Sequence, residues 1–225
     1  MLIPRYCFSG DYEDFYEYFL TRPHTPKTFR KNECLWNRGE TVTHIHYIIS
    51  GVALTALEHE NGSRKICSFH SGGTVFPGCH RSAFKIEHSI TTTAVTDMET
   101  LCFTNETFLD MLSENKDLMF CTLDWHAAYI NLLLYESAHQ DYNNSFIKLC
   151  NLLYLFSRNS PGNESGRIDL TQENIAEILT VTRVNAARNL GRLRDERIIV
   201  PHRRWIEIID QQALEAYCSE ETLQA

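Results

Sequence analysis

The side chains with the clearest chemical potential gather in one short stretch late in the chain. Residues 183–204 contain seven arginines against two acidic residues, although the chain of 225 residues carries a formal net charge of −8. The guanidinium of arginine can pair with both acceptors of guanine in the major groove, and the amide of asparagine can pair with adenine. Because Asn185 and Asn189 lie between these arginines, we expect the stretch to bind DNA at base edges as well as at phosphates.

A pair of short helices is predicted to position these side chains. Thr171 and Thr182 each suit the N-cap of a helix, which predicts helices over 174–179 and 183–193 with a tight turn at 180–181 between them. In a helix-turn-helix, the second helix lies in the major groove with its first residues at the base edges. The residues expected to contact DNA are Thr171, Gln172, Thr182, Arg183, Val184, Asn185, Ala186, Arg188, Asn189, Arg192, His202 and Arg203.

A basic hairpin is predicted immediately after the second helix. Residues 198–209 form two strand-like runs around a tip that contains His202 and Arg203, which is the pattern of the wing in a winged helix-turn-helix. Arg194 and Arg197 are placed to contact phosphates. The alternative for this region is an ordinary α+β module whose arginines are only a solvated surface.

Residues 28–108 have the texture of antiparallel β-structure. Short apolar runs alternate with turns, and Asn61-Gly62 between two such runs is a strong hairpin signal. This pattern is typical of a sandwich or barrel. The composition, 43% hydrophobic and 22% charged, is that of a globular protein. Because no apolar run approaches the roughly 20 residues of a membrane span and residues 1–5 lack the features of a signal peptide, we expect a cytoplasmic protein without a membrane partner.

A long helix is predicted from Asn115 to about His139, where neither Gly nor Pro interrupts the chain. It is apolar over most of its circumference, so it must be covered on two sides. The helix is either a central core helix or one that packs against its own β-domain and against the same helix of a second subunit. The a/d positions that we assign to the dimer contact are Leu118, Cys121, Trp125, Ala128, Leu132 and Tyr135, and a second apolar face consists of Leu123, Ala127, Ile130 and Leu134.

The cysteines and histidines give a weaker signal. None of the eight cysteines forms a Cys-x-x-Cys pair or a zinc-finger spacing, which predicts mostly buried, reduced thiols. His44 and His46 lie on the same side of a predicted strand and could reach one ligand, and Cys79-His80 is a second local cluster. A cupin-like metalloenzyme using His44 and His46 is therefore the alternative to a binding protein, but no further ligand can be identified, so no metal, cofactor or catalytic residue is predicted.

The order of a β-roll, a long helix and a winged helix-turn-helix resembles the Crp/Fnr superfamily of bacterial transcription regulators, over nearly the whole chain. The matching segments are Gly39-Glu40, Tyr47-Ile48-Ile49-Ser50-Gly51, Asn61-Gly62, Thr171-Gln172-Glu173-Asn174-Ile175-Ala176 and Thr182-Arg183-Val184-Asn185-Ala186-Ala187-Arg188. The resemblance implies an α+β fold with an N-terminal cyclic-nucleotide-binding-like antiparallel β-roll over 1–112, a long dimerisation helix and hinge over 113–142, and a C-terminal winged helix-turn-helix over 143–225. The long-helix register and Val184 look most similar to the halorespiration-type members that sense chlorinated aromatic acids.

Departures from the family pattern reduce the range of effectors that we expect. Members that bind cyclic nucleotides use the Glu of a Gly-Glu-Leu segment, whereas the matching segment here, Phe76-Pro77-Gly78-Cys79, lacks a carboxylate. Arg81-Ser82-Ala83 lies early for the phosphate-binding segment, and Cys7 alone lies where oxygen-sensing members hold iron and sulfur. Neither a cyclic nucleotide nor an iron–sulfur cluster is therefore expected. Val184 replaces a frequent Glu, which predicts an A·T-richer half-site.

The function implied is that of a homodimeric transcription regulator that binds a palindromic operator. A small effector between the β-roll and the long helix would control operator affinity through a hinge near Tyr142, and RNA polymerase would be a partner if the protein is an activator. A regulator that binds DNA constitutively, without an effector, is the alternative. The residues expected to line the effector pocket are Cys79, Phe84, Lys85, His88, Trp125, His126 and Tyr129.

Overall fold

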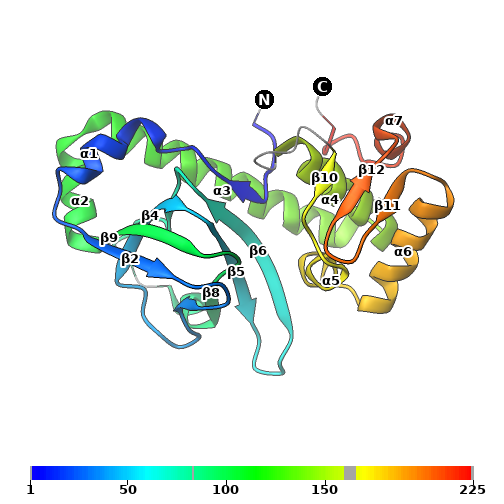
Figure 1. Cartoon of the computed structure of the whole chain (residues 1–225), viewed down its shortest axis with the longest axis horizontal. Coiled ribbons are helices and arrows are strands. Elements are labelled where there is room, and N and C mark those ends of the chain that lie inside the picture. Colours follow the sequence, from blue (N-terminus) through cyan, green and yellow to red (C-terminus); the bar gives the residue numbers. More distant parts are fainter. Residues whose placement is uncertain (1, 83, 160–165, 224–225) are drawn as a thin grey trace. The chain divides into compact units, whose positions relative to one another are not determined.

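In the computed structural model, contacts within the chain divide it into two units (Figure 1). One unit is Cys7–Ala127 and the other is Met1–Tyr6 with Ala128–Ala225. The structure describes residues 2–82, 84–159 and 166–223, so Ala83 of the segment 81–83 lies outside the described residues. The division falls inside helix α3 (Lys116–Tyr142), whose last residue is also the last residue of the predicted dimerisation helix.

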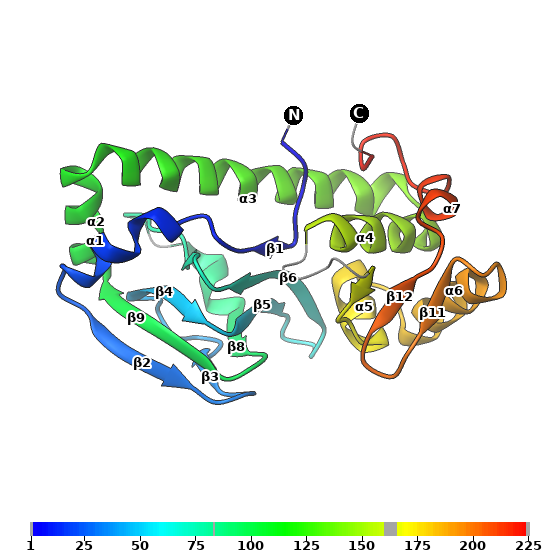
Figure 2. The same cartoon turned by 45° about the horizontal axis from the view of Figure 1, so that its top comes forward.

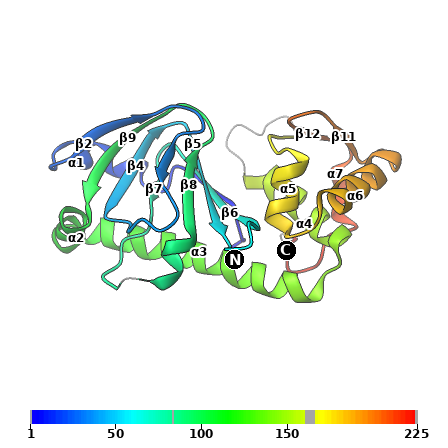
Figure 3. The same ribbon diagram turned by 90° about the horizontal axis from the view of Figure 1, so that it is seen from below.

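The unit Cys7–Ala127 contains two β-sheets (Figure 3). The five-stranded sheet has the order β1-β6-β5-β8-β3, and the four-stranded sheet has the order β2-β9-β4-β7. The strand pairs are antiparallel except for β1 with β6, so the predicted antiparallel β-roll is confirmed. The strands are β1 (Cys7–Phe8), β2 (Thr25–Phe29), β3 (Cys34–Trp36), β4 (His44–Ser50), β5 (Val52–Glu58), β6 (Arg64–Ser71), β7 (Val75–Phe76), β8 (Ile90–Ala94) and β9 (Met98–Thr104).

The hairpin predicted at Asn61-Gly62 connects β5 to β6. The Asn61 side chain accepts a hydrogen bond from the backbone N–H of Ser63 at 2.9 Å. Gly62 has φ +85°, a left-handed conformation that glycine adopts without a steric penalty. The sequence signal and the local geometry therefore agree, since both residue types are suited to this turn.

Alternation along β4 and β9 produces one apolar and one polar sheet face. Ile45, Tyr47 and Phe103 are buried on the apolar face, where the Phe19 ring lies 5.0 Å from Tyr47 and 5.6 Å from Phe103 between ring centroids. His46 faces the other way, toward the five-stranded sheet. The helical elements before α3 are the 3-10 helices η1 (Glu13–Phe15) and η2 (Lys85–Ser89) and the α-helices α1 (Tyr16–Leu20) and α2 (Asn105–Glu114).

Helix α3 is the longest helix, as its sequence predicts (Figure 2). The helix begins at Lys116 because the side-chain oxygen of Asn115 caps it. This oxygen accepts hydrogen bonds from the backbone N–H groups of Asp117 and Leu118, both at 3.1 Å. It extends to Tyr142, three residues beyond the predicted end at His139. Within the described ranges, no helix combines the length and the apolar character that crossing a membrane requires.

The described residues of the second unit form four further helices and a small sheet. The sheet has the order β10-β12-β11, and its first strand was not predicted because it is only two residues long. Helix α4 contributes Leu149, Cys150 and Leu153 to the core of this unit. The elements are α4 (Ser145–Asn159), β10 (Arg167–Ile168), α5 (Gln172–Leu179), α6 (Arg183–Asp195), β11 (Ile199–Pro201), β12 (Ile206–Ile208) and α7 (Gln211–Glu215).

The cysteines only partly follow the sequence expectation. All eight are free thiols, as predicted. Only Cys102 and Cys150 are buried, however, and Cys34 is exposed while the others are half-buried, so the expectation of mostly buried thiols is wrong. Cys7 and Cys34 are the first residues of short strands, Cys79 lies in a loop, and Cys121 lies on a half-covered face of α3, positions that composition and spacing do not reveal.

Candidate nucleic-acid interface

Two N-caps fix the helix-turn-helix. The Thr171 hydroxyl accepts a hydrogen bond from the Asn174 backbone N–H at 3.1 Å, and the Asn174 side chain accepts one from the Thr171 backbone N–H at 3.1 Å. This reciprocal capping box begins α5. The Thr182 hydroxyl accepts a hydrogen bond from the Asn185 backbone N–H at 3.2 Å and begins α6. Both predicted caps are confirmed, and both helices follow the predicted bounds within two residues.

The turn between the helices contains a strained residue. Thr180 has φ 54° and ψ 45°, the left-handed conformation, at the end of α5. Its backbone N–H and that of Val181 both donate to the carbonyl oxygen of Ala176, which closes the helix. A β-branched side chain in this conformation is disfavoured sterically, whereas glycine is not.

We expect Thr180→Gly to stabilise the C-terminal unit by about 0.5–1 kcal/mol, because relief of the left-handed strain exceeds the added entropy of the unfolded chain. Urea unfolding of the whole protein measures this change. Thr180→Ala is the matched control, since it removes the same side-chain atoms beyond Cβ but keeps the Cβ that the left-handed conformation disfavours. A Thr180→Gly protein that is no more stable than the Thr180→Ala protein would contradict the expectation.

The first two turns of α6 present the exposed reading surface. Arg183 and Arg188 are exposed, and the Val184 side chain between them is 77% exposed. The Arg188 guanidinium donates a hydrogen bond to the Asn185 side-chain oxygen, which holds these two predicted base readers together. Gln172, at the start of α5, is also exposed. The surface therefore offers guanidinium donors, an amide and an apolar side chain, the groups that read base edges in the major groove.

Three residues of the predicted reading set are buried or make contacts within the unit. Ala186 is 1% exposed, because it lies on the same inner face of α6 as Leu190, and it cannot reach DNA. The Asn189 amide donates to the Ser145 hydroxyl of α4 at 3.1 Å. The Arg192 guanidinium lies 3.8 Å from the Phe146 ring centroid, 5.2 Å from that of Tyr217, and donates to Glu196 at 2.9 Å. Asn189 and Arg192 therefore attach α6 to the rest of the unit.

The predicted wing is present as β11 and β12 (Figure 2). At its tip the backbone N–H of His202 donates to the carbonyl oxygen of Trp205 at 2.8 Å, and the two rings stack with centroids 3.6 Å apart. The Arg167 guanidinium of β10 lies 4.9 Å from the Trp205 ring centroid, a contact that sequence reasoning missed. Arg203 and Arg204 are exposed beside this stack, so the wing presents two cations at its tip.

The residues predicted to line an effector pocket are not gathered around a described cavity. Trp125 is 4% exposed and packs 5.5 Å from Phe8 between ring centroids. A Cβ at Gly78 would lie 2.7 Å from the imidazole of His126, so this space is filled. Phe84 is 51% exposed and stacks 4.4 Å from His80. Of the remaining predicted residues, Lys85 and His88 are exposed, Cys79 is half-buried with a thiol pKa raised by burial, and Tyr129 is half-buried in the other unit.

Aromatic rings fill the interior near the segment that lacks the carboxylate. Phe76 stacks on Trp36 with centroids 5.6 Å apart and planes 8° apart, and His70 lies 3.9 Å from Phe76. Phe76 and Trp36 are 5% and 7% exposed. The described residues 2–82, 84–159 and 166–223 contain no group of three or more His, Cys, Asp or Glu arranged to hold a metal ion.

The apolar surface of α3 differs from the one assigned to the dimer contact. Among the assigned residues, Leu118, Trp125 and Leu132 are at most 4% exposed because they face the core of their own chain. The assigned Ala128 is likewise buried, while Cys121 and Tyr135 are half-buried and bonded within the chain. The exposed apolar side chains between residues 119 and 134 are Met119, Phe120, Leu123, Ala127, Ile130, Leu133 and Leu134. The second apolar face of the sequence, rather than the first, is therefore free.

Two family models match the chain. The model described as cyclic nucleotide-binding domain matches residues 26–115, and the model described as Crp-like helix-turn-helix domain matches residues 147–217. No curated protein sequence is similar enough to the chain to count as a match. The two matched segments coincide with the β-roll and with the helices and wing described above.

Solved structures share this fold at low sequence identity. FixK2 from Bradyrhizobium japonicum has a TM-score of 0.74 and 17% identity, with 90% of this chain and 100% of that chain covered. CprK complexed with OCPA has a TM-score of 0.71 and 18% identity, covering 95% and 98%. A CooA mutant from Carboxydothermus hydrogenoformans has a TM-score of 0.72 and 16% identity, covering 86% and 87%. At these low sequence identities, the structural similarity shows that the fold is shared.

Proposed function

Because the chain belongs to the Crp/Fnr superfamily of DNA-binding transcription regulators, we propose that it binds a palindromic operator as a homodimer and that a small effector controls its operator affinity. The observation that carries the proposal is the exposed surface of Arg183, Val184 and Arg188 on capped helix α6. Members of this family are regulators rather than enzymes, so the β-roll supplies binding and not catalysis. Such a protein acts in the cytoplasm, where its DNA is.

The dimer is proposed to form through α3. Phe120, Leu123, Ala127, Ile130 and Leu134 follow the alternating spacing of three and four residues that defines a coiled-coil seam. An apolar seam of this length is costly to leave in water and is explained by a second copy of the same helix. Two reading helices in such a dimer would enter successive major grooves about 34 Å apart.

Regulation is proposed to work by population shift. The effector acts only as far as it binds the DNA-competent state more tightly than the other state. We place the effector in the N-terminal unit beside the segment Cys79–His88, whose exposed Phe84 and Lys85 offer an aromatic ring and a cation. RNA polymerase is a further partner if the protein activates transcription.

We expect cyclic AMP and cyclic GMP not to bind. The segment Phe76-Pro77-Gly78-Cys79 supplies no carboxylate for a ribose hydroxyl, and the stacked rings of Trp36 and Phe76 occupy the interior beside it. Isothermal titration calorimetry of the intact protein tests this, with differential scanning fluorimetry as a second readout. Saturable heat together with a raised melting temperature for either nucleotide would contradict the expectation.

Selection of binding sites from a random duplex library tests the proposed function. Repeated rounds of binding and sequencing are expected to enrich an inverted repeat whose half-sites lie one helical turn apart, with A·T-rich half-sites opposite Val184. A library in which no motif is enriched, or one in which a single unrepeated half-site is enriched, would contradict the proposed dimeric reader.

A further inference from the structure

A polar patch covers the inner face of the four-stranded sheet where β4 begins. Strand pairing places His46 opposite Cys102 and Lys27 opposite Thr100, and paired residues point to the same side of a sheet. His44 shares this side because it lies two residues before His46. A sheet face that meets another sheet normally holds apolar residues, whereas a buried imidazole, hydroxyl and thiol lie here beside a lysine. The His46 ring bonds to the Thr100 hydroxyl at 3.0 Å and lies 3.9 Å from the Cys102 sulfur, so these three groups satisfy one another.

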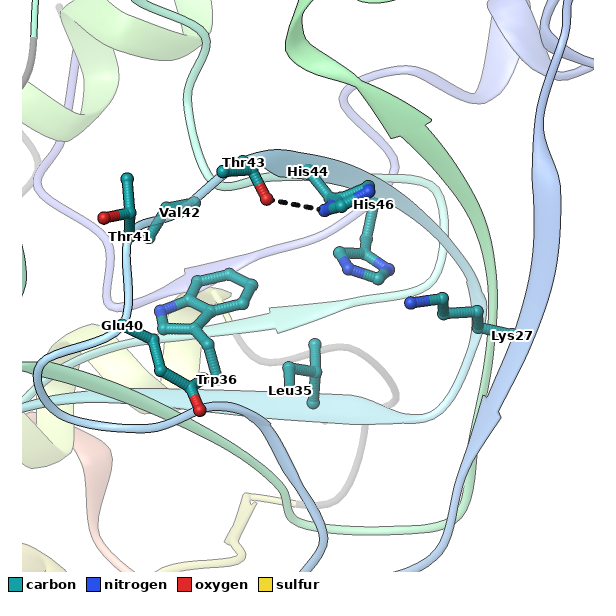
Figure 4. A pocket seen from close by; sticks show the side chains of 9 residues that line it. All are labelled: Lys27, Leu35, Trp36, Glu40, Thr41, Val42, Thr43, His44 and His46. Atoms are coloured by element: carbon teal, nitrogen blue, oxygen red, sulfur yellow. Dashed lines mark hydrogen bonds between the residues drawn. The ribbon is translucent and has the colours of Figure 1, made fainter.

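A cavity of about 150 Å³ opens on this patch (Figure 4). Leu35, Val42 and the Trp36 ring give it an apolar wall, and Lys27 lies on the opposite side with its ammonium directed inward. A second cavity of about 260 Å³ also contacts Lys27 and His44. A cavity of the smaller size accommodates a molecule with a single ring or a chain of a few carbons.

The charge at the Lys27 end of the cavity favours a carboxylate at that end. No ion pair joins Lys27 to an acidic group anywhere in the described part of the chain, so its charge is available. The carboxylate of Glu40, also in the lining, is engaged by the Asn37 backbone N–H at 2.8 Å and by the Asn37 amide at 3.3 Å. Burial, reinforced by the charge of Lys27, lowers the pKa of His46 to about 4, so His46 is neutral at pH 7. The Lys27 ammonium is therefore a cation at one end of the lining without an acidic partner among the described residues, while the carboxylate of Glu40 is held at the opposite end by Asn37.

A buried donor marks the other end of the cavity. The indole N–H of Trp36 is buried and has no hydrogen-bond partner among the described residues. In Figure 4 it lies on the side of Glu40 and Thr41, away from Lys27. The ring is fixed by stacking on Phe76, 5.6 Å away, and on His46, 6.3 Å away. Such a donor is costly to bury unpaired, and a ligand oxygen would satisfy it.

We propose that this cavity binds a short-chain carboxylate with a second oxygen acceptor, such as an oxo acid. Its carboxylate pairs with the Lys27 ammonium, its carbon chain lies against Leu35 and Val42, and its second oxygen accepts the hydrogen bond of the Trp36 indole N–H. The site lies within the β-roll, apart from the segment Cys79–His88, and the inference stands whether or not the proposed effector binds there.

The probe is 4-oxopentanoate, added to the intact protein labelled with ¹⁵N and observed by its indole N–H signals. The Trp36 signal, assigned from its loss in Trp36→Phe, is expected to move downfield saturably, while those of Trp125 and Trp205 stay in place. Lys27→Met should weaken the affinity at least about fivefold through loss of the charged partner. Lys31→Met, a nearby lysine outside both cavities, should leave it unchanged.

Three comparison compounds sharpen the result. Pentanoate, which lacks the second oxygen acceptor, should bind more weakly and leave the Trp36 indole N–H signal at its position in the free protein. The uncharged 2-pentanone should not bind. The inference is overturned if 4-oxopentanoate leaves Trp36 unmoved, if Lys27→Met binds it as tightly as the wild type, or if inorganic phosphate moves the signal equally. Operator binding is measured on the same sample. Because the carboxylate site and the proposed DNA-binding function are measured separately, either proposal can fail while the other holds.

Discussion

The double substitution Leu123→Glu and Ile130→Glu is expected to convert the proposed dimer into monomers and to weaken operator binding at least about 100-fold. These side chains are 57% and 56% exposed in one protomer, so the exchange leaves the fold of the protomer intact. In the dimer it would bury carboxylates against those of the partner helix, which is strongly unfavourable. A monomer then reads one half-site and loses the high effective concentration that the first half-site gives the second.

Sedimentation velocity measures the oligomeric state, and fluorescence anisotropy measures the operator affinity. Leu123→Met with Ile130→Leu is the matched control, because it changes the same positions while keeping their volume and apolar character. That control should remain a dimer with wild-type affinity. A double-glutamate variant that still sediments as a dimer and binds the operator normally would show that another surface holds the protomers together.

Arg188→Ala is expected to weaken operator binding by about 1–3 kcal/mol and to relax sequence preference at one position of each half-site. The guanidinium is exposed on the outer face of α6 and bonded to the Asn185 side chain, so it is held in place for a base edge. Loss of a phosphate contact alone would instead weaken binding to all sequences about equally. Anisotropy titrations with the operator and with single-base variants separate the two cases.

Arg194→Ala serves as the matched control. This exposed arginine at the end of α6 is paired with Asp195 at 2.8 Å and is expected to contact a phosphate at most. Its replacement should lower operator affinity less than Arg188→Ala does and leave the base preference intact. Equal losses and unchanged preferences in both variants would show that Arg188 does not read a base.

The C-terminal unit could be predicted closely because its signals are local. Thr171 and Thr182 cap their helices through bonds to residues three positions along the chain, and the left-handed turn at Thr180 follows directly. The Asn61-Gly62 hairpin is local in the same sense. Where the residues that determine a feature are neighbours in sequence, composition and spacing suffice.

Which apolar face of α3 is exposed could not be predicted, because two apolar faces of the helix follow the same alternating spacing. Only tertiary contacts show that Trp125 and Leu132 belong to the core of one protomer while Leu123 and Ile130 are exposed. The same limit explains Arg192, which spacing places outward on α6 and which is exposed there, but whose guanidinium also lies against the rings of Phe146 and Tyr217 from distant segments. The polar cavity was indicated by the sequence only through the pair of histidines at 44 and 46, since its other residues come from separate strands.

The central claim is that the chain reads a specific DNA sequence through α6, and the most direct measurement is the ratio of two affinities. Anisotropy titration with the selected operator and with a scrambled duplex of equal length, at one fixed salt concentration, gives that ratio. The account predicts an operator affinity about 1,000-fold or more above the scrambled affinity when the protein is in its DNA-competent state. Equal affinities for the two duplexes, in the presence and absence of candidate effectors, would contradict it.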